Sequence, residues 1–332
     1  MKEMANLKNV LLLGAGGNVT NGIYRILKDN KYRGNRVFVS CVKHVPVKQE
    51  DFFLLSPYAN DKSFCLWLSG IINMYSIDIV VSGVEEIINE VAKNRDFFKS
   101  QNVDFAFESN EKIQIFQSKL ATSKWLRDNK IRYPKFFSSE DNSRFDVEFF
   151  FGIDRLILKP NSGKSSQGIR IFDYSDFDKV CVPEGYIVQE YIGDESEEIT
   201  VGCLLHNNKV YQCQLRRELL NGHTMKVELI CNSLVTEYCE KIVRLINPKY
   251  PINIQLRIDK DGLPVCFEIN LRVSGSAPFR HLLNFRDVEA MFYVNDSASL
   301  DDYFVDMFPV GTIGQRFYRE EVDFKGQLIG FS

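Results

Sequence analysis

Four polar residues that could bind a metal ion or an anion stand close together in the last third of the sequence: Gln255, Glu268, Asn270 and Arg272. Each of these residues alternates with apolar neighbours, so in an extended strand the polar side chains lie on one side and the apolar side chains on the other. A carboxylate and two amides offer the oxygen ligands that magnesium prefers while it bridges to substrate phosphates. An adjacent arginine suits a phosphate or a carboxylate. The set therefore predicts a magnesium and phosphate site, although a sheet with one solvated face shows the same alternation.

The two stretches that carry these residues, Ile252–Ile258 and Leu263–Leu271, are predicted to form a hairpin. Asp259 opens the turn between them and Gly262 closes it, as turn chemistry requires. Pairing Ile258 with Leu263 makes the apolar faces coincide, with Phe267 on the apolar side. The turn lacks the remaining ligands of a calcium loop.

A loop of small residues and lysines lies upstream, between the strands Leu156–Leu158 and Ile169–Phe172. Such a loop can fold over phosphates and offer backbone N–H groups. Lys159 can reach an α-phosphate and Lys164 the terminal phosphates. The segment is not a Walker loop, since no helix follows it. An exposed hairpin loop is the alternative reading.

An apolar strand that carries a carboxylate, Tyr186–Gly193, follows this loop. Its backbone groups can hydrogen-bond an adenine edge, and Glu198 at the start of the next strand can hold a ribose. Glu195 and Glu197 belong to the same acidic turn and are expected to face solvent.

In this order, the elements resemble the ATP-grasp superfamily, and most closely the synthetase units of the carbamoyl phosphate synthetase large subunit. The resemblance covers roughly residues 110–295. It is carried by Ser118–Thr122 with Asn129–Pro134, Leu158–Gly168, Val188–Ile192, Ile254–Arg257 and Phe267–Gly275. Ser118 stands where the family usually has Asp, and Leu271 stands where Pro is usual.

The resemblance implies a role for each matching residue. ATP would be held by Lys119, Lys159, Ser165, Gln189, Glu190, Tyr191, Ile192, Glu198 and Gln255. Magnesium, with manganese as a possible substitute, would be bound by Gln255, Glu268 and Asn270. Arg272 and Lys164 would act on the transferred phosphoryl group. The expected reaction is carbon–nitrogen ligation through an acyl phosphate, with ATP converted to ADP and phosphate.

The first hundred residues supply the supporting elements. Apolar runs at Val10–Leu13, Val37–Val42, Ile77–Val81 and Val103–Phe107 alternate with helical patterns at 19–28, 64–75 and 87–98. Such alternation predicts a parallel sheet with helices on its faces. A helix is expected over 111–129 with Asn110 as its N-cap, then a loop at 138–144. A later helix over 234–246 is expected with Ser233 as its cap.

The predicted fold class is α/β and α+β: a Rossmann-like domain that precedes a two-lobed ATP-grasp unit. We expect divisions at 1–110, 111–190 for the linker helix and small lobe, and 191–332 for the large lobe with the metal site.

A glycine turn, Leu13–Val19, follows the first strand and invites a dinucleotide reading. However, Val19 occupies the third glycine position of the fingerprint, and the second strand ends without an acidic residue. A tight strand-to-helix connection needs glycine for its own sake. The structural explanation of the glycine turn is therefore favoured. An NAD-dependent reductase that uses the N-terminal sheet is kept as the alternative from a different class of protein.

The amino-acid composition limits the classes of molecule that the protein is expected to bind. The chain has 332 residues and a net charge of −3, so no basic excess favours nucleic acid or a membrane surface. Eight dispersed cysteines, without a CxxC pair, indicate buried thiols in a reducing cytoplasm. We expect small carboxylate and amine substrates, and a homodimer is possible.

Two further alternatives remain within the nucleotide-binding class: phosphoryl transfer without amide formation, and a non-catalytic nucleotide sensor. Substrate contacts are expected from the N-terminal domain and from loops around Arg216, Arg217, His223 and Ser274–Ser276.

Overall fold

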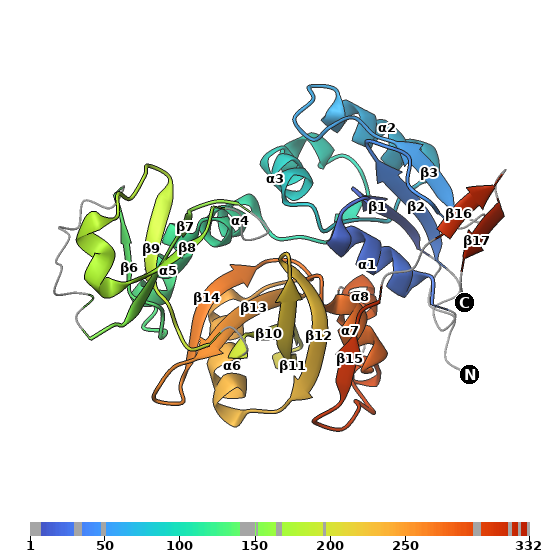
Figure 1. The fold of residues 1–332 in the computed structure, drawn as a ribbon. Helices are drawn as coiled ribbons and strands as arrows, with labels where there is room; N and C mark the ends of the chain where they lie inside the picture. Colours follow the sequence, from blue (N-terminus) through green and yellow to red (C-terminus); the bar gives the residue numbers. More distant parts are fainter. Residues whose placement is uncertain are drawn as a thin grey trace.

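The structure is a computed structural model of the whole chain. It describes residues 8–29, 35–47, 51–139, 150, 152–163, 168–194, 197–294, 300–317, 321–324 and 327–330. Three sheets within these residues, with the helices between them, form the body of the molecule (Figure 1).

The N-terminal sheet is parallel throughout and has the strand order β3-β2-β1-β4-β5. Its strands are β1 (Asn9–Leu13), β2 (Arg36–Cys41), β3 (Phe52–Leu55), β4 (Ile79–Ser82) and β5 (Asp104–Phe105). Its helices are α1 (Asn18–Leu27), α2 (Phe64–Tyr75), α3 (Glu85–Lys93) and the 3-10 turn η2 (Arg95–Phe98). The predicted parallel sheet is confirmed.

Two details of this sheet were not predicted. The edge strand β3 has the wholly apolar sequence Phe-Phe-Leu-Leu, but it is only four residues long and partly exposed, so the run was too short to be predicted as a strand. The helix predicted over 87–98 is divided, because the chain leaves the helical conformation at Asn94 before η2 begins.

The glycine turn after β1 has a structural explanation. Gly14 has φ +78, and a side chain there would lie 2.7 Å from Val84 Cγ2. The turn thus requires glycine both for its backbone conformation and for its close contact with the β4–α3 connection.

The single helix predicted over 111–129 is wrong, because the structure contains two helices, α4 (Asn110–Gln117) and α5 (Lys119–Asp128). Ser118 separates them in an extended conformation and accepts a hydrogen bond from Ala121 N at 3.0 Å. A serine at a helix N-cap stabilises the new helix start. The α4 cap is also Ser109 rather than the predicted Asn110, which is the first helical residue.

A four-stranded antiparallel sheet follows, with the order β6-β9-β7-β8. It consists of β6 (Phe136–Ser138), β7 (Arg155–Pro160), β8 (Arg170–Asp173) and β9 (Tyr186–Glu190), with the 3-10 turn η4 (Tyr174–Lys179) after β8. Most of the loop predicted at 138–144 lies outside the described residues.

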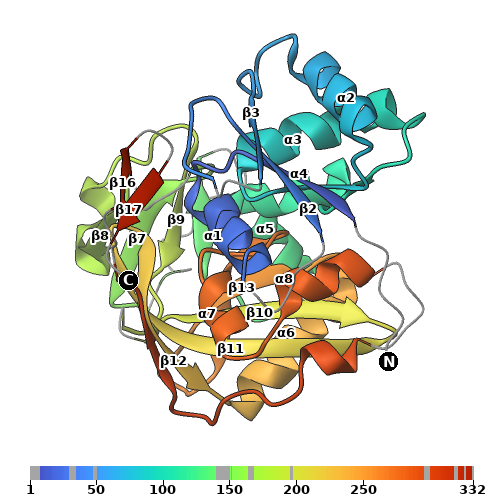
Figure 2. The ribbon, with the colours of Figure 1, turned by 90° about the vertical axis from the view of Figure 1, so that its right-hand side faces the viewer.

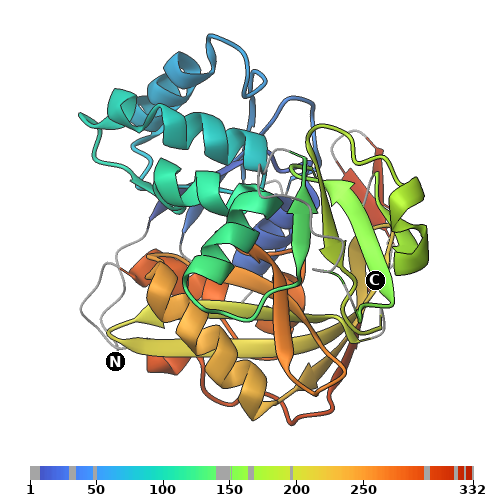
Figure 3. The same ribbon diagram turned by 90° about the vertical axis from the view of Figure 1, so that its left-hand side faces the viewer.

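The largest sheet has the order β14-β13-β10-β11-β12-β15 and is antiparallel. Its strands are β10 (Ile199–His206), β11 (Lys209–Leu220), β12 (His223–Ile230), β13 (Ile252–Ile258), β14 (Pro264–Asn270) and β15 (Ile313–Gln315). The 14-residue helix α6 (Ser233–Ile246) packs on one face together with α4 and α5 (Figure 3). Its cap is Asn232, which accepts from Leu234 N and Val235 N, rather than the predicted Ser233.

The other face of this sheet is covered by α7 (Ala277–Leu282) and α8 (Asp287–Ala290), followed by the 3-10 turns η6 (Met291–Tyr293) and η7 (Asp301–Tyr303). Figure 2 shows α1 of the N-terminal sheet beside α7 and α8. Their apolar residues share one core with β1, β2 and β4, so the N-terminal sheet is anchored directly on the large sheet's helices. The pair β16 (Glu321–Phe324) and β17 (Gln327–Gly330) follows.

The β13–β14 hairpin is confirmed, but its predicted register is wrong. Ile258 pairs with Pro264 rather than with Leu263, and Leu256 pairs with Cys266. The next pair is Gln255 with Glu268, so Phe267 is the extra residue of a β-bulge. Among the described residues, no helix has the length and apolar character needed to cross a membrane.

Candidate active site

A cavity of about 750 Å³ lies where the three sheets meet. Its walls come from the N-terminal turns at 17–19 and 83–85, from β7, β8 and β9 of the small sheet, and from β11, β13 and β14 of the large sheet. Eleven of the thirteen site residues predicted from the sequence lie in the described part of the chain, and all eleven line this cavity. The other two, Lys164 and Ser165, lie outside the described residues.

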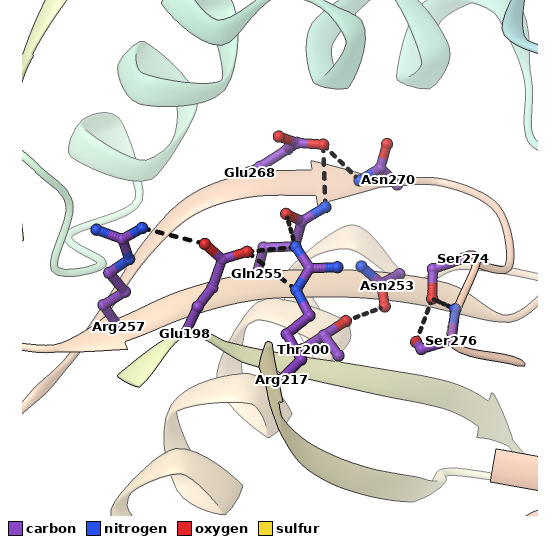
Figure 4. A network of polar contacts seen from close by, with 10 residues as sticks. All are labelled: Glu198, Thr200, Arg217, Asn253, Gln255, Arg257, Glu268, Asn270, Ser274 and Ser276. Carbon is purple, nitrogen blue, oxygen red and sulfur yellow. Dashed lines mark hydrogen bonds and ion pairs between the residues drawn. The ribbon is translucent and has the colours of Figure 1, made fainter. Parts of the chain in front are cut away.

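The predicted metal-binding residues form one end of a continuous polar network (Figure 4). Gln255 Nε2 donates to Glu268 Oε1 at 3.0 Å, and Asn270 Nδ2 donates to the same oxygen at 2.8 Å. Arg217 Nη2 donates to Gln255 Oε1 at 2.6 Å. The convergence of Gln255, Glu268 and Asn270 predicted from strand alternation is therefore present.

Glu268 is held as an anion by its surroundings. Burial acts to raise the pKa of its carboxyl, but Lys119, the Asn270 amide, Lys159 and Arg217 together lower it below its ordinary value. A buried carboxylate that stays ionised among cations is ready to bind a divalent metal ion.

Lys159 projects from the end of β7 and is only 5% exposed. Burial, reinforced by the nearby charge of Lys119, lowers the pKa of its ammonium group to about 8. Its Nζ lies 5.5 Å from the centre of the Phe267 ring. Such a desolvated cation gains strongly from an anionic partner.

Asn161, just after β7, fixes the two lysines relative to each other. Its Oδ1 accepts from Leu120 N at 2.8 Å and from Ser118 Oγ at 2.9 Å, while Lys119 N donates to the Asn161 carbonyl at 3.0 Å. The break before α5 thus places Lys119 at a helix start, directly beside the end of β7 that carries Lys159. Ser118, where the family usually has Asp, makes this junction.

The end of the cavity beneath the small sheet is apolar. It is lined by Ile157, Ile171, Ile192 and Phe267, with Tyr191 beside them. The Arg155 and Arg257 guanidinium carbons lie 4.7 and 4.8 Å from the centre of the Tyr191 ring. A slot with aliphatic and aromatic walls suits a flat heterocycle.

The side chains of the predicted adenine hinge mostly support the fold. Gln189 is 1% exposed, and its Nε2 donates to Ser123 Oγ at 2.7 Å, while Glu190 Oε2 accepts from Lys135 N at 3.2 Å. The backbone N–H groups of Glu190 and Tyr191 already donate to the Lys135 and Arg155 carbonyls, at 2.8 and 3.0 Å, so the Ile192 N–H is the remaining donor candidate for an adenine edge.

Glu198 lies in the cavity wall but is held by two arginines. It accepts hydrogen bonds from Arg217, with Nε at 2.9 Å, and from Arg257 Nη2 at 3.1 Å. This arrangement orients the carboxylate and links the apolar end of the cavity to Gln255. Glu197, by contrast, is exposed, as predicted for a solvated turn; Glu195 lies outside the described residues.

The opposite end of the cavity reaches the N-terminal sheet. Arg272 Nη2 donates to Glu85 Oε1 at 2.5 Å, and the side chains are 16% and 27% exposed. Arg272 Nε is buried and has no hydrogen-bond partner among the described residues. Asn18 Nδ2 lies 3.3 Å from His223 Nδ1 on the neighbouring wall.

The prediction of loops around Arg216, Arg217 and His223 is wrong, because both arginines lie in strand β11 and His223 begins strand β12. Arg217 and His223 line the cavity, whereas Arg216 points outward and pairs with Glu228 at 2.9 Å. Alternation along β11 explains why adjacent arginines have different surroundings.

The Ser274–Ser276 turn is held from behind by a buried cation. Arg280 is fully buried and donates from Nη1 to Ser274 Oγ at 3.1 Å and Ser276 Oγ at 2.9 Å. Its Nη2 pairs with Asp287 at 2.6 Å. This pairing satisfies the buried charge and fixes the chain that leaves Arg272.

Several lining residues were missed by sequence reasoning. Phe267 was assigned to the core, because the bulge that turns it into the cavity leaves no mark in an alternating pattern. Ile157 and Arg257 belong to predicted strands, but their neighbours across the cavity come from another sheet. Glu85 and Asn18 stand at helix starts, and only the packing of the N-terminal sheet shows that they face Arg272 and His223.

Comparisons with known proteins agree with this geometry. Residues 183–283 match the family model described as ATP-grasp in the biosynthetic pathway with Ter operon. No curated protein matches the sequence. An N5-carboxyaminoimidazole synthetase structure from Staphylococcus aureus is similar with a TM-score of 0.68 at 14% identity, covering 89% of this chain and 78% of that one.

Two other solved structures show the same likeness. Carboxyaminoimidazole ribonucleotide synthase from Aspergillus clavatus, solved with ATP, has a TM-score of 0.70 at 14% identity, covering 92% of this chain and 81% of that one. An L-amino acid ligase from Bacillus licheniformis has a TM-score of 0.68 at 14% identity and covers 92% and 78%. The chain therefore has an ATP-grasp fold, preceded by a parallel-sheet domain. The family match confirms, for residues 183–283, the ATP-grasp resemblance predicted from the motifs.

Proposed function

We propose that this chain is an ATP-dependent ligase that joins a carboxylate to an amine through an acyl phosphate. The observation that carries the proposal is the single cavity in which Lys119, Lys159 and Arg272 surround Glu268 and its two amides. The ATP-grasp fold and its ligase neighbours support the same reaction class. The proposal includes the division of the chain into an N-terminal domain at 1–110, a linker helix and small lobe at 111–190, and a large lobe at 191–332.

The residues divide the reaction between two ends of the cavity. At the apolar end, Ile157, Ile192 and Phe267 enclose the adenine, while Lys159 and Lys119 hold the phosphates. At the other end, Arg272 binds the carboxylate oxygen that attacks the γ-phosphorus. ADP leaves, the amine attacks the acyl carbon of the resulting acyl phosphate, and phosphate is released. Catalysis then consists mainly of positioning and charge stabilisation.

The Gln255, Glu268 and Asn270 donors fit magnesium, with manganese as a substitute. They are hard oxygen ligands, and Glu268 is held ionised. When bound, the metal neutralises charge on the transferring phosphoryl group. Among the described residues there is no group of three or more His, Cys, Asp and Glu side chains suited to a metal ion. Phosphate oxygens and waters would therefore complete the coordination of a metal at Glu268.

The proposal is tested by binding and by trapping. Calorimetry should show that Mg-ATP binds, whereas NAD and NADP do not. Phosphate release should require a carboxylate, and hydroxylamine added in place of the amine should yield a hydroxamate. Hydroxamate formation separates a ligase from the alternative phosphotransferase that forms no acyl phosphate. Binding of NAD without binding of Mg-ATP would contradict the proposal.

A further inference from the structure

The substrate end of the cavity carries one ion pair whose two members both face the ligand space, Arg272 and Glu85. Glu218, the other charged residue of the wall near His223, already pairs with Lys226 at 2.7 Å. The neighbours of the ion pair are Asn18, His223 and Ser274, together with the glycine turns. Other cations of the wall are already near carboxylates: Lys119 and Lys159 are near Glu268, and Arg217 and Arg257 contact Glu198.

The Arg272–Glu85 pair is a contact between two parts of the fold. Glu85 is the first residue of α3 in the N-terminal sheet, and Arg272 follows β14 of the large sheet. Their 2.5 Å contact is largely shielded from solvent, yet both side chains line the cavity. Arg272 Nη1 donates to the Val273 carbonyl at 3.1 Å, and the buried Nε has no partner among the described residues. Because each terminal nitrogen carries a second N–H, the guanidinium has capacity for another acceptor beside Glu85.

The charge pattern restricts which ligand can enter. If a simple anion took Arg272 away from Glu85, a poorly solvated carboxylate would be left beside the anion. A ligand that is only a cation would leave Arg272 unpaired in the same way. A ligand that carries a carboxylate and an ammonium group on adjacent atoms satisfies both side chains together.

We propose that the substrate whose carboxylate is activated is an α-amino acid, with its carboxylate on Arg272 and its ammonium group on Glu85. This inference rests on the proposed ligase function and specifies the substrate class of the same site. Glu85 then selects amino acids over carboxylates that lack the amino group. Loss of a charge-assisted hydrogen bond of this kind changes affinity by about 10- to 100-fold.

The decisive experiment compares amino acids with matched analogues on the full chain. The twenty protein amino acids, their 2-hydroxy acid counterparts and their carboxamides are each titrated into the protein with Mg-ADP, and are assayed for ATP-dependent phosphate release. At least one amino acid should bind about 10- to 100-fold more tightly than its 2-hydroxy acid and its carboxamide. If no amino acid binds better than its 2-hydroxy acid, the inference is wrong.

Glu85→Gln provides the second arm, and Glu86→Gln is its control. Glu86 lies next to Glu85 on α3 and is exposed, so its variant makes the same charge change away from the cavity. Glu85→Gln should raise the KM for the amino acid by about 10- to 100-fold while the KM for ATP and the affinity for the 2-hydroxy acid stay unchanged. A merely structural ion pair would instead lower Tm and affect all substrates equally, which would overturn the inference.

Failure of the inference is distinguishable from failure of the proposed function. If Mg-ATP binds and 2-hydroxy acids, dicarboxylates or phosphorylated acids support hydroxamate formation while amino acids do not, only the inference is wrong. If Mg-ATP does not bind and no amino acid binds, both are wrong.

Discussion

Glu268 is the one carboxylate among the proposed metal ligands, so its charge should matter more than its shape. Glu268→Gln retains the size of the side chain but removes the charge that neutralises magnesium. We expect turnover to fall by roughly 100-fold or more, equivalent to about 3 kcal/mol of transition-state stabilisation. Steady-state kinetics at saturating Mg-ATP measures this effect.

The matched control is Glu228→Gln, which changes a half-exposed glutamate that pairs with Arg216 on the same sheet. Its turnover should remain close to wild type, since exposed ion pairs contribute little. If Glu268→Gln retained wild-type turnover, the metal assignment would be wrong, and the β13–β14 face would be an ordinary half-exposed sheet.

Lys159 should make ATP binding dependent on pH. Its pKa is lowered to about 8 by burial and by Lys119, and bound phosphates must raise it again. Binding therefore takes up a proton near and above pH 8. The affinity for Mg-ATP should weaken as pH rises from 7.5 to 9.5, by up to about tenfold per pH unit.

Calorimetry in buffers of different ionisation enthalpy measures the proton uptake directly. In Lys159→Arg the dependence should flatten, because a guanidinium remains charged throughout this range. An unchanged pH dependence in Lys159→Arg would assign the titration to another group.

Among the elements, β10 and α7 pack so closely that a glycine is required between them. A side chain at Gly202 would lie 2.4 Å from Arg280 Nε and 2.6 Å from Arg280 Cδ. Gly202→Ala should destabilise the protein by about 1–3 kcal/mol through overpacking. It should also lower turnover, since Arg280 fixes the Ser274–Ser276 turn beside the cavity.

Urea denaturation compares this variant with Gly70→Ala. Gly70 lies within α2, where an added methyl group meets no atom within 4 Å. That variant should gain roughly 0.5–1 kcal/mol because alanine favours the helix. If the two variants had equal free energies of unfolding, the close contact at Gly202 would not oppose a larger side chain.

Helices and strands were predicted correctly where the spacing of apolar residues in the sequence was regular. Helix α2 and strand β13 have the bounds predicted from apolar spacing. The break at Ser118 was missed because helix-forming residues continue on both sides of it, and the competing contact is Asn161, far along the chain. The site residues in motifs were found, whereas Glu85 depends on packing between sheets and carries no local signal.

For the whole molecule, one buried histidine links the N-terminal sheet to the helices of the large sheet. His281 Nδ1 lies 2.5 Å from Glu289 Oε1, and Nε2 lies 2.7 Å from Asp29 Oδ2 just after α1. Burial acts to lower the pKa of this imidazole, but Glu289 and Asp29 together raise it above 6.5. The imidazolium is thus favoured in the folded protein.

Because the folded pKa is raised, this contact contributes stability below about pH 6.5, and the contribution is lost as pH rises through the folded pKa. The Tm difference between wild type and His281→Gln should be large at pH 6 and should shrink toward pH 9. Thermal unfolding across this range measures it. A difference that grows with pH would mean that the histidine is neutral when folded.

The bulge at Phe267 has a consequence for how such a site can be lost. Removing this one residue would make the pairs Leu256–Cys266 and Gln255–Glu268 consecutive in an uninterrupted ladder. Each remaining side chain would keep its side of the sheet, so a shortened chain would still fold and still present Glu268. What would disappear is the aromatic wall beside Lys159. The bulge residue therefore supplies the aromatic wall rather than the pairing of the strands, so its removal should weaken binding of a flat ring while β13 and β14 stay paired.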